Sequence, residues 1–190
     1  DHALFLALLD ALEGADSAEH KEALAEVFLL GVHYSGGFPI FGNGAMIIAA
    51  MPSPDPSGGI DVSGDFSGWE PDINPMNRDP DIPFYWLSIP HPGEPAAYKY
   101  KLVHHRGSGD DWQPDPWARR YGYDEYGEFS LAAPDSNASH LERYHRFAAT
   151  GLGNERTVRL YMPAGYESMT DLPALSMHDG QNLFDPAAGF

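Results

Sequence analysis

Apolar residues near the start of the chain recur at the spacing of an amphipathic helix. One helical face would carry apolar residues at positions i, i+3, i+4 and i+7, namely Phe5, Leu8, Leu9 and Leu12. Gly14 predicts the end of this helix, because glycine readily adopts the backbone conformation that terminates one. Asp16 followed three residues later by Glu19 is a capping-box pattern, which predicts the start of a second helix.

The second helix has an apolar face of its own. Leu24, Val27 and Phe28 lie on one side, and Gly31 predicts its end. The pattern therefore predicts a helical hairpin over residues 2–30. We expect this hairpin to pack against the β-rich region that follows; the alternative is a helix pair that binds a partner protein.

From Gly36 onward the chain is rich in Gly and Pro, and short runs of β-forming residues replace the helical pattern. Asn43-Gly44 is a favoured hairpin turn between two such runs. The predicted strands cover residues 38–41, 45–50, 60–63, 84–89, 98–103 and 129–131. Short strands separated by turn residues indicate an antiparallel sandwich over about residues 36–135. Trp86 lies in the middle of a strand, so we expect it in the core.

The last third of the chain predicts a second hairpin and one further strand. Residues 141–150 alternate loosely, and residues 156–162 alternate clearly between apolar and polar positions. After a polar loop, residues 172–177 form a short apolar run that ends at His178.

Composition and charge narrow the functional classes. The 190 residues are 43% hydrophobic, which is enough for a core, and 28 acidic against 11 basic residues give a formal net charge of −17. A chain this acidic repels phosphate backbones and anionic lipids. We therefore predict no nucleic-acid or membrane partner. No apolar run approaches a membrane span, and the absence of Cys excludes disulfides and thiolate chemistry. The chain begins with Asp1, so we expect a fragment of a longer protein, which leaves the compartment unknown.

A group of histidines and aspartates close together in the sequence is a candidate metal site. His104-His105 and Asp110-Asp111 flank the flexible-looking stretch 107–109. Adjacent residues on a strand point to opposite faces, so two consecutive histidines rarely share one ion. We therefore predict that these are solvated loop residues, and we predict no metal and no cofactor.

Several blocks of the β-rich region carry a resemblance to a known group. The sequence V-S-G-D-F-S-G-W at residues 62–69 resembles a strand and turn of the early-set (E-set) immunoglobulin-like modules. These modules precede glycogen-branching enzymes and enterochelin-esterase-like hydrolases and occur in the AMP-activated kinase β-subunit. Further blocks follow in the same order at residues 75–76, 86–90, 98–103 and 112–116.

The glycan-binding members of this group stack two tryptophans on sugar rings and use a lysine to bind hydroxyls. By position, Trp69, Trp112 and Lys101 resemble these residues. The aromatic faces would cover the apolar C–H face of a sugar. The kinase-subunit motif also has two asparagines near its last strand, and residues 127–130 lack them. The alternative for the two tryptophans is a role as loop anchors of the sandwich.

A second resemblance covers the C-terminal third. R-T-V-R-L-Y-M-P-A-G-Y at residues 156–166 and L-P-A-L-S-M-H-D-G-Q-N-L-F-D at residues 172–185 resemble the opening strands of enterochelin-esterase-like and feruloyl-esterase-like domains of the α/β-hydrolase superfamily. The resemblance implies ester hydrolysis by a Ser-His-acid triad. It also implies an oxyanion-hole loop that includes Gly180 and Gln181, with the Gln181 N–H as the donor.

The catalytic groups themselves are not found in the chain. His178 is not the catalytic base, because that histidine follows the nucleophile in this superfamily, and no G-x-S-x-G elbow occurs. We therefore expect the chain alone to be inactive.

The combined prediction is a mainly β, immunoglobulin-like (E-set) sandwich with a helical hairpin before it and the first strands of an α/β-hydrolase domain after it. The expected domains are a hairpin at 1–35, an E-set module at 36–135 and an incomplete esterase domain at 136–190. The parent protein would be a serine carboxylic-ester hydrolase acting on a small-molecule ester, with a homo-oligomer allowed by the resemblance. The alternative functions are a non-catalytic α-glucan-binding module, with a glycan as partner, and a structural or dimerisation module.

Overall fold

The chain forms two helices followed by a β structure. In the computed structural model, the described residues are 2–91, 98–132, 138–151, 153–177 and 183–184. The helices are α1 (His2–Gly14) and α2 (Ala18–Tyr34), and short 3-10 turns are η1 (Asp65–Ser67) and η2 (Tyr166–Ser168). The strands are β1 (Ile40–Gly42), β2 (Ala45–Ala50), β3 (Ile60–Gly64), β4 (Asn77–Arg78), β5 (Tyr85–Pro90), β6 (Tyr98–Arg106), β7 (Gly109–Gln113), β8 (Arg120–Asp124), β9 (Gly127–Ala132), β10 (His140–Ala149) and β11 (Asn154–Met162).

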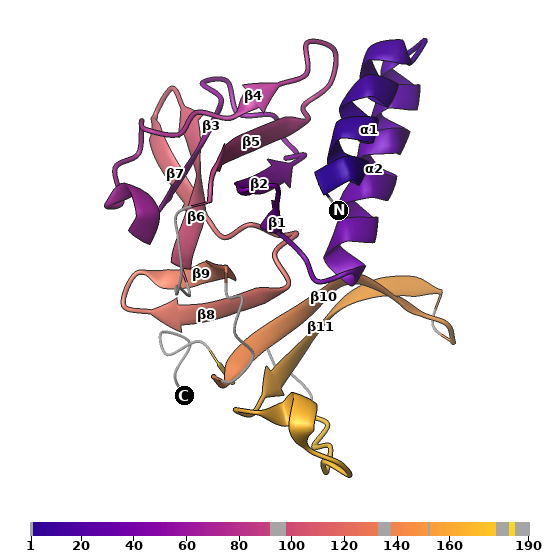
Figure 1. Cartoon of the computed structure of the whole chain (residues 1–190), viewed down its shortest axis with the longest axis vertical. Helices are drawn as coiled ribbons and strands as arrows, with labels where there is room; N and C mark the ends of the chain where they lie inside the picture. Colours follow the sequence, from indigo (N-terminus) through magenta and orange to yellow (C-terminus); the bar gives the residue numbers. More distant parts are fainter. Residues whose placement is uncertain (1, 92–97, 133–137, 152, 178–182, 185–190) are drawn as a thin grey trace.

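The strands of the described residues form two sheets. One has the order β1-β2-β5-β4, and the other has the order β11-β10-β8-β9-β6-β3, with β7 paired to β6. All of the strand pairs are antiparallel. A mainly β sandwich with two helices is consistent with the predicted immunoglobulin-like fold (Figure 1).

A first apolar core fills the space between the sheets. Met46 and Ile48 of β2 face it from the smaller sheet. Val62, Tyr100 and Leu102 face it from the larger sheet, and none of the three is more than 1% exposed. Side chains alternate along a strand. Lys101 and Val103, the neighbours of Leu102 on β6, therefore point to the other face of the larger sheet.

A second core lies between the helices and the outer face of the smaller sheet. Phe5 and Leu29 of the helices pack there with Ile47 and Ala49 of β2 and with Phe84. The smaller sheet is therefore covered on both faces, which explains why residues 45–50 are an unbroken apolar run rather than an alternating one. The expected packing of the helical hairpin on the β-rich region is confirmed (Figure 1).

The boundaries and the buried face of α2 differ from the prediction. Ser17, rather than Asp16, caps the helix, because its side chain accepts a hydrogen bond from the His20 N–H. The helix also continues past Gly31 to Tyr34. Its buried residues are Lys21, Ala25, Leu29 and His33. Val27 is 72% exposed, so the predicted apolar face was wrong at that position. The sequence concealed this face because two of its members, Lys21 and His33, are polar.

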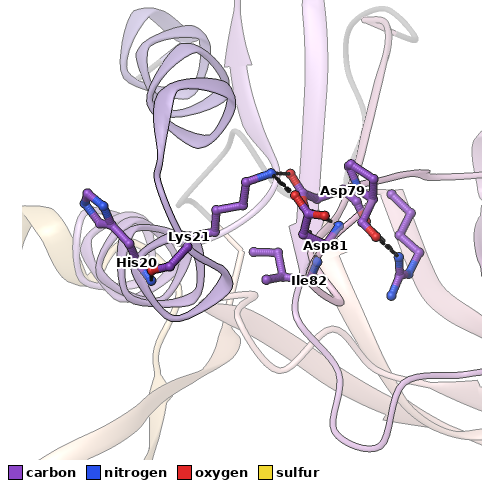
Figure 2. A network of polar contacts seen from close by, with 8 residues as sticks. His20, Lys21, Asp79, Asp81 and Ile82 are labelled. Atoms are coloured by element: carbon purple, nitrogen blue, oxygen red, sulfur yellow. Dashed lines mark hydrogen bonds and ion pairs between the residues drawn. The ribbon is translucent and has the colours of Figure 1, made fainter.

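Lys21 anchors α2 to the smaller sheet through an ion pair (Figure 2). Its Nζ donates to Asp79 Oδ2 at 3.2 Å and to Asp81 Oδ2 at 2.7 Å. Asp79 is buried, and its Oδ1 also accepts from the backbone N–H groups of Asp81 and Ile82. The hydrogen bond to Asp81 raises the pKa of Lys21, so the ammonium stays charged against its burial. The turn before β5 and the helix are thus fixed to each other.

Most predicted strands are confirmed, and three strands were missed. The runs predicted at 38–41, 45–50, 60–63, 84–89, 98–103 and 129–131 overlap β1, β2, β3, β5, β6 and β9. The missed strands are β4, β7 and β8, whose sequences NR, GDDWQ and RYGYD contain few apolar residues. Trp86 of β5 was expected in the core; it is only partly buried and packs against the second core, so this prediction holds in part.

The C-terminal third forms the predicted hairpin but no further strand. β10 pairs with β11, and β10 also pairs with β8 through Leu141 and Tyr121, so this hairpin extends the larger sheet. Residues 172–177 are not a strand and are exposed, so that prediction is wrong. A strand needs a hydrogen-bonded neighbour, and none of the described strands pairs with this segment. The α/β-hydrolase strands are therefore not confirmed, and the domain boundaries stay a prediction.

Neither helix in the part of the chain that the structure describes is long and apolar enough to cross a lipid bilayer.

Candidate functional site

An open groove lies beside the larger sheet, on its face away from the first core. It encloses about 1030 Å³. The residues that line it are Asp65, Trp69, Lys99, Lys101, Trp112, Asp124, Glu125 and Tyr126. The three residues that the sequence singled out for glycan binding, Trp69, Lys101 and Trp112, are all among them. They come from three segments of the chain, and the fold brings them together.

The pairing of β6 with its neighbours sets the directions of Lys101 and Trp112. Lys101 pairs with Ser63 of β3, and Trp112 of β7 pairs with Val103 of β6. Directly opposed residues in antiparallel strands share a face, so Trp112 lies on the same face as Lys101. Trp112 is 37% exposed, which leaves much of its indole open to the groove.

A tight turn after β3 positions Trp69. Gly68 and Trp69 both have a φ of +63°, a left-handed conformation that is uncommon for tryptophan. The Trp69 indole N–H donates to Asp65 Oδ1 at 3.0 Å, and Asp65 Oδ2 accepts from the Lys99 N–H at 2.8 Å. These bonds fix the turn to β6. They hold the rings of Trp69 and Trp112 at 6.4 Å between centroids, with planes inclined at 38°.

The turn between β8 and β9 forms the polar wall of the groove. Lys101 Nζ donates to the Tyr126 carbonyl oxygen at 2.7 Å, and Asp124 Oδ1 accepts from the Tyr126 N–H at 2.9 Å. Lys99 Nζ donates to Asp124 Oδ2 at 3.0 Å. Tyr126 is 78% exposed and lines the groove together with the two tryptophans.

The groove carries both hydrogen-bond donors and hydrogen-bond acceptors. Burial raises the pKa of Asp124, but the bonds from Lys99 and Tyr126 outweigh burial and lower it overall, so the carboxylate is ionised at neutral pH. An ionised carboxylate accepts hydrogen bonds, and an ammonium group donates them. Hydroxyl groups do both, so a groove of two lysines, three carboxylates and three aromatic rings suits a neutral, hydroxyl-rich ligand.

Sequence reasoning missed the contribution of the β8–β9 turn. Asp124, Glu125 and Tyr126 were not singled out, because β8 was not predicted and its turn therefore had no assigned place. Asp65 and Lys99 lie within the blocks at residues 62–69 and 98–103 but were not singled out either. The signal that was available is D-E-Y-G at residues 124–127, a hairpin turn in which Gly127 has a φ of +88°. This turn lies directly before residues 127–130, the stretch that lacks the asparagines of the kinase-subunit motif.

The esterase residues cannot be placed. Gly180 and Gln181 lie outside the described residues, so the oxyanion-hole assignment stays a prediction.

The His104-His105 pair belongs to a strand, so the prediction of a solvated loop is wrong. Both residues lie in β6, and residues 107–108 form the turn into β7, which carries Asp110 and Asp111. His104 is 5% exposed, and burial lowers its pKa. Burial also lowers the pKa of His105, but hydrogen bonds to Asp110 and Asp61 outweigh it, so that pKa is raised overall. The pattern misled because Gly-Ser-Gly occurs in flexible loops and in tight hairpins alike.

Comparison with known proteins adds one match. No family model matches the chain. The chain is similar over one segment to a glucan branching enzyme. The match is to "1,4-alpha-glucan branching enzyme GlgB" of Novosphingobium aromaticivorans, with 41% identity over 59 residues. It covers 31% of this chain and spans 8% of the length of that enzyme.

This match is compatible with the E-set immunoglobulin-like module that the sequence predicts, as is the observed β sandwich. The match supports the alternative prediction of an α-glucan-binding module better than it supports the esterase prediction. The ester substrate and the homo-oligomer stay predictions.

Proposed function

We propose that the groove binds an α-1,4-linked glucan, and that this chain acts as a carbohydrate-binding module. The observation that carries the proposal is the convergence of Trp69 and Trp112, whose ring centroids are 6.4 Å apart, beside Lys101 in one groove. Each tryptophan offers an apolar face to the C–H groups of a sugar ring, and the polar wall offers partners for its hydroxyls.

The angle between the rings favours a curved chain of sugars. The two indole planes are inclined at 38° and are therefore not coplanar. An α-1,4-linked glucan curves from one sugar to the next, whereas a β-1,4-linked glucan is a flat ribbon. Two inclined rings can each stack on a sugar of the curved chain. The name of the matched relative, a 1,4-alpha-glucan branching enzyme, supports the same linkage.

The proposal is tested by titrating maltoheptaose and cellohexaose into the protein and following binding by isothermal calorimetry. We expect maltoheptaose to bind and cellohexaose to bind far more weakly. Trp69→Ala and Trp112→Ala should each weaken binding by about tenfold or more, since an aromatic stacking contact contributes on the order of 1 kcal/mol beyond the area it buries. Tyr161→Ala is the matched control, because Tyr161 is 57% exposed but lies on β11, outside the groove.

Wild-type affinity in either tryptophan variant would contradict the stacking site. Equal binding of the two oligosaccharides would contradict the α-glucan assignment.

A further inference from the structure

A cluster of one histidine and three aspartates lies on the same face of the larger sheet as the groove. His105 of β6 pairs with Asp110 of β7, two positions along β7 from Trp112. Asp61 of β3 pairs with Val103, so it also shares the face of His105. Asp72 reaches the cluster from the loop after Trp69. The cluster thus joins three strands of the sheet, β3, β6 and β7, to the loop after Trp69, which lines the groove.

The ligand atoms of this cluster are close enough to surround one ion. His105 Nε2 lies 2.7 Å from Asp61 Oδ2 and 3.8 Å from Asp72 Oδ1. One ligand atom from each of Asp61, Asp72 and His105 lies within 4.8 Å of the others. Two ligands of a tetrahedral Zn²⁺ ion, bound at about 2.0–2.1 Å, lie roughly 3.3 Å apart. The observed separations fall on both sides of that value, and the exposed side chain of Asp72 can move to adjust them.

The carboxylate of Asp61 is a buried acceptor without enough partners. The side chain is 9% exposed, and its Oδ1 is buried without a hydrogen-bond partner among the described residues. A buried carboxylate oxygen without a partner is costly, so such an atom is expected to bind a water, a ligand or an ion. In the part of the chain that the structure describes, the ion pairs of Asp61, Asp72 and Asp110 all lead to the one imidazole of His105.

Asp110 holds His105 in the orientation that a metal ligand needs. His105 Nδ1 lies 2.8 Å from Asp110 Oδ1. When Nδ1–H donates to this carboxylate, the lone pair of Nε2 points to Asp61 and Asp72. A carboxylate that orients the second nitrogen in this way is the usual outer partner of a histidine that binds a metal.

We propose that Asp61, Asp72 and His105 bind a divalent transition-metal cation of the Zn²⁺ class, with Asp110 positioning the imidazole. One imidazole nitrogen and two carboxylate oxygens suit Zn²⁺, which accepts such mixed ligands and leaves a fourth position for water. Ca²⁺ prefers six to eight oxygen ligands, and this cluster does not supply them from its protein side chains. The cation would tie the loop that carries Trp69 to β3 and β6.

The test uses untagged protein treated with a chelator and then dialysed, with ZnCl₂ titrated at neutral pH by isothermal calorimetry. We expect one Zn²⁺ per chain. Asp61→Asn and His105→Gln should each lose more than about 100-fold in affinity, because each removes a ligand. Asp110→Asn should lose roughly 10–100-fold, because it removes the outer partner. Asp72→Asn should also weaken binding, and its exposed position makes it the variant least able to disturb the fold.

Asp111→Asn is the matched control. Asp111 is the neighbouring acidic residue on β7, but its carboxylate pairs with Arg106 and accepts from Gln113 rather than facing His105. We expect it to bind Zn²⁺ as the wild type does. Circular dichroism of each variant without metal checks that it is folded.

The proposal is overturned if the wild type shows no saturable Zn²⁺ binding, or if Asp72→Asn and His105→Gln bind as tightly as the wild type. Ca²⁺ binding as tight as Zn²⁺ binding would also overturn it, because an imidazole ligand disfavours Ca²⁺. None of these measurements involves a glucan, so they are independent of the proposed glucan binding.

Discussion

At the scale of single residues, Asp115 shows how burial changes the pKa of a carboxyl group. It is fully buried, and its carboxylate accepts from the Tyr100 hydroxyl and the Trp117 N–H, each at 2.9 Å. Its own N–H donates to Ser130 Oγ at 2.8 Å. Burial raises the pKa of Asp115 from 3.8 to about 6, even though the hydrogen bonds from Trp117 and Tyr100 act in the opposite direction.

This pKa predicts how stability changes with pH. Between about pH 4 and pH 6 the folded chain keeps the Asp115 proton that the unfolded chain has lost, so stability falls as the pH rises. This rise in pKa from 3.8 to about 6 corresponds to a free energy on the order of 3 kcal/mol. Asp115→Asn removes this contribution and keeps an acceptor for Trp117. In urea unfolding, the unfolding free energy of the variant relative to that of the wild type should therefore increase as the pH rises over this range. An unfolding free energy that changes with pH equally in both proteins would contradict the prediction.

At the scale of elements, α2 is fixed to the β structure by polar contacts near both of its ends. Lys21 pairs with Asp79 and Asp81 near the start of the helix. Near its end, His33 Nδ1 lies 3.0 Å from the Trp117 carbonyl oxygen, and its Nε2 accepts from the His145 N–H at 2.8 Å. The apolar residues between these anchors provide the packing, and the anchors define the position of the helix.

The His33 anchor requires a neutral imidazole, because Nε2 must keep its lone pair for the His145 N–H. Burial lowers the pKa of His33, with nearby arginines acting in the same direction. Below about pH 6.5 the unfolded chain takes up a proton that the folded chain resists, so stability falls as the pH falls.

We expect His33→Gln, which offers one donor and one acceptor, to show a smaller loss of melting temperature than the wild type when the pH is lowered from about 7.5 to about 5.5. Burial also lowers the pKa values of His104 and His145, so the difference between the two proteins isolates His33. An equal loss in both proteins would contradict the assigned role.

At the scale of the whole molecule, the smaller sheet joins the two cores. β2 sends Met46 and Ile48 into the core between the sheets, and it sends Ile47 and Ala49 into the core beneath the helices. Loss of the helices would therefore expose the outer face of this sheet. The helices and the sandwich should unfold together.

Leu29→Ala tests this coupling. Leu29 is fully buried beneath the helices, and its truncation should cost about 2–5 kcal/mol of unfolding free energy. Val27→Ala, on the exposed side of the same helix, should change stability by less than about 0.5 kcal/mol. In both variants, urea transitions followed by far-ultraviolet circular dichroism and by tryptophan fluorescence should coincide. Helical signal that disappears before the fluorescence change would show that the two cores are separable.

The elements that sequence reasoning recovered are those with a clear periodic or continuous apolar pattern. The face of α1, the hairpin of β1 and β2 and the long strand β6 follow from residue patterns. β7 and β8 were missed because polar residues dominate them, and α2 was misassigned because Lys21 and His33 are buried through partners distant in the sequence. The predicted strand at 172–177 shows the converse: an apolar run is not sufficient where no neighbouring strand pairs with it.

By itself, the sequence determined that the chain is mainly β and that a helical hairpin precedes the strands. It also identified Trp69, Lys101 and Trp112 as candidate glycan-binding residues. Local propensity and motif order carry that information. Only the tertiary structure decided that these residues share one groove, that the β8–β9 turn forms its polar wall, and that Asp61, Asp72 and His105 converge. These are contacts between segments distant in the sequence, and the pairing and register of non-adjacent strands fix which side chains meet.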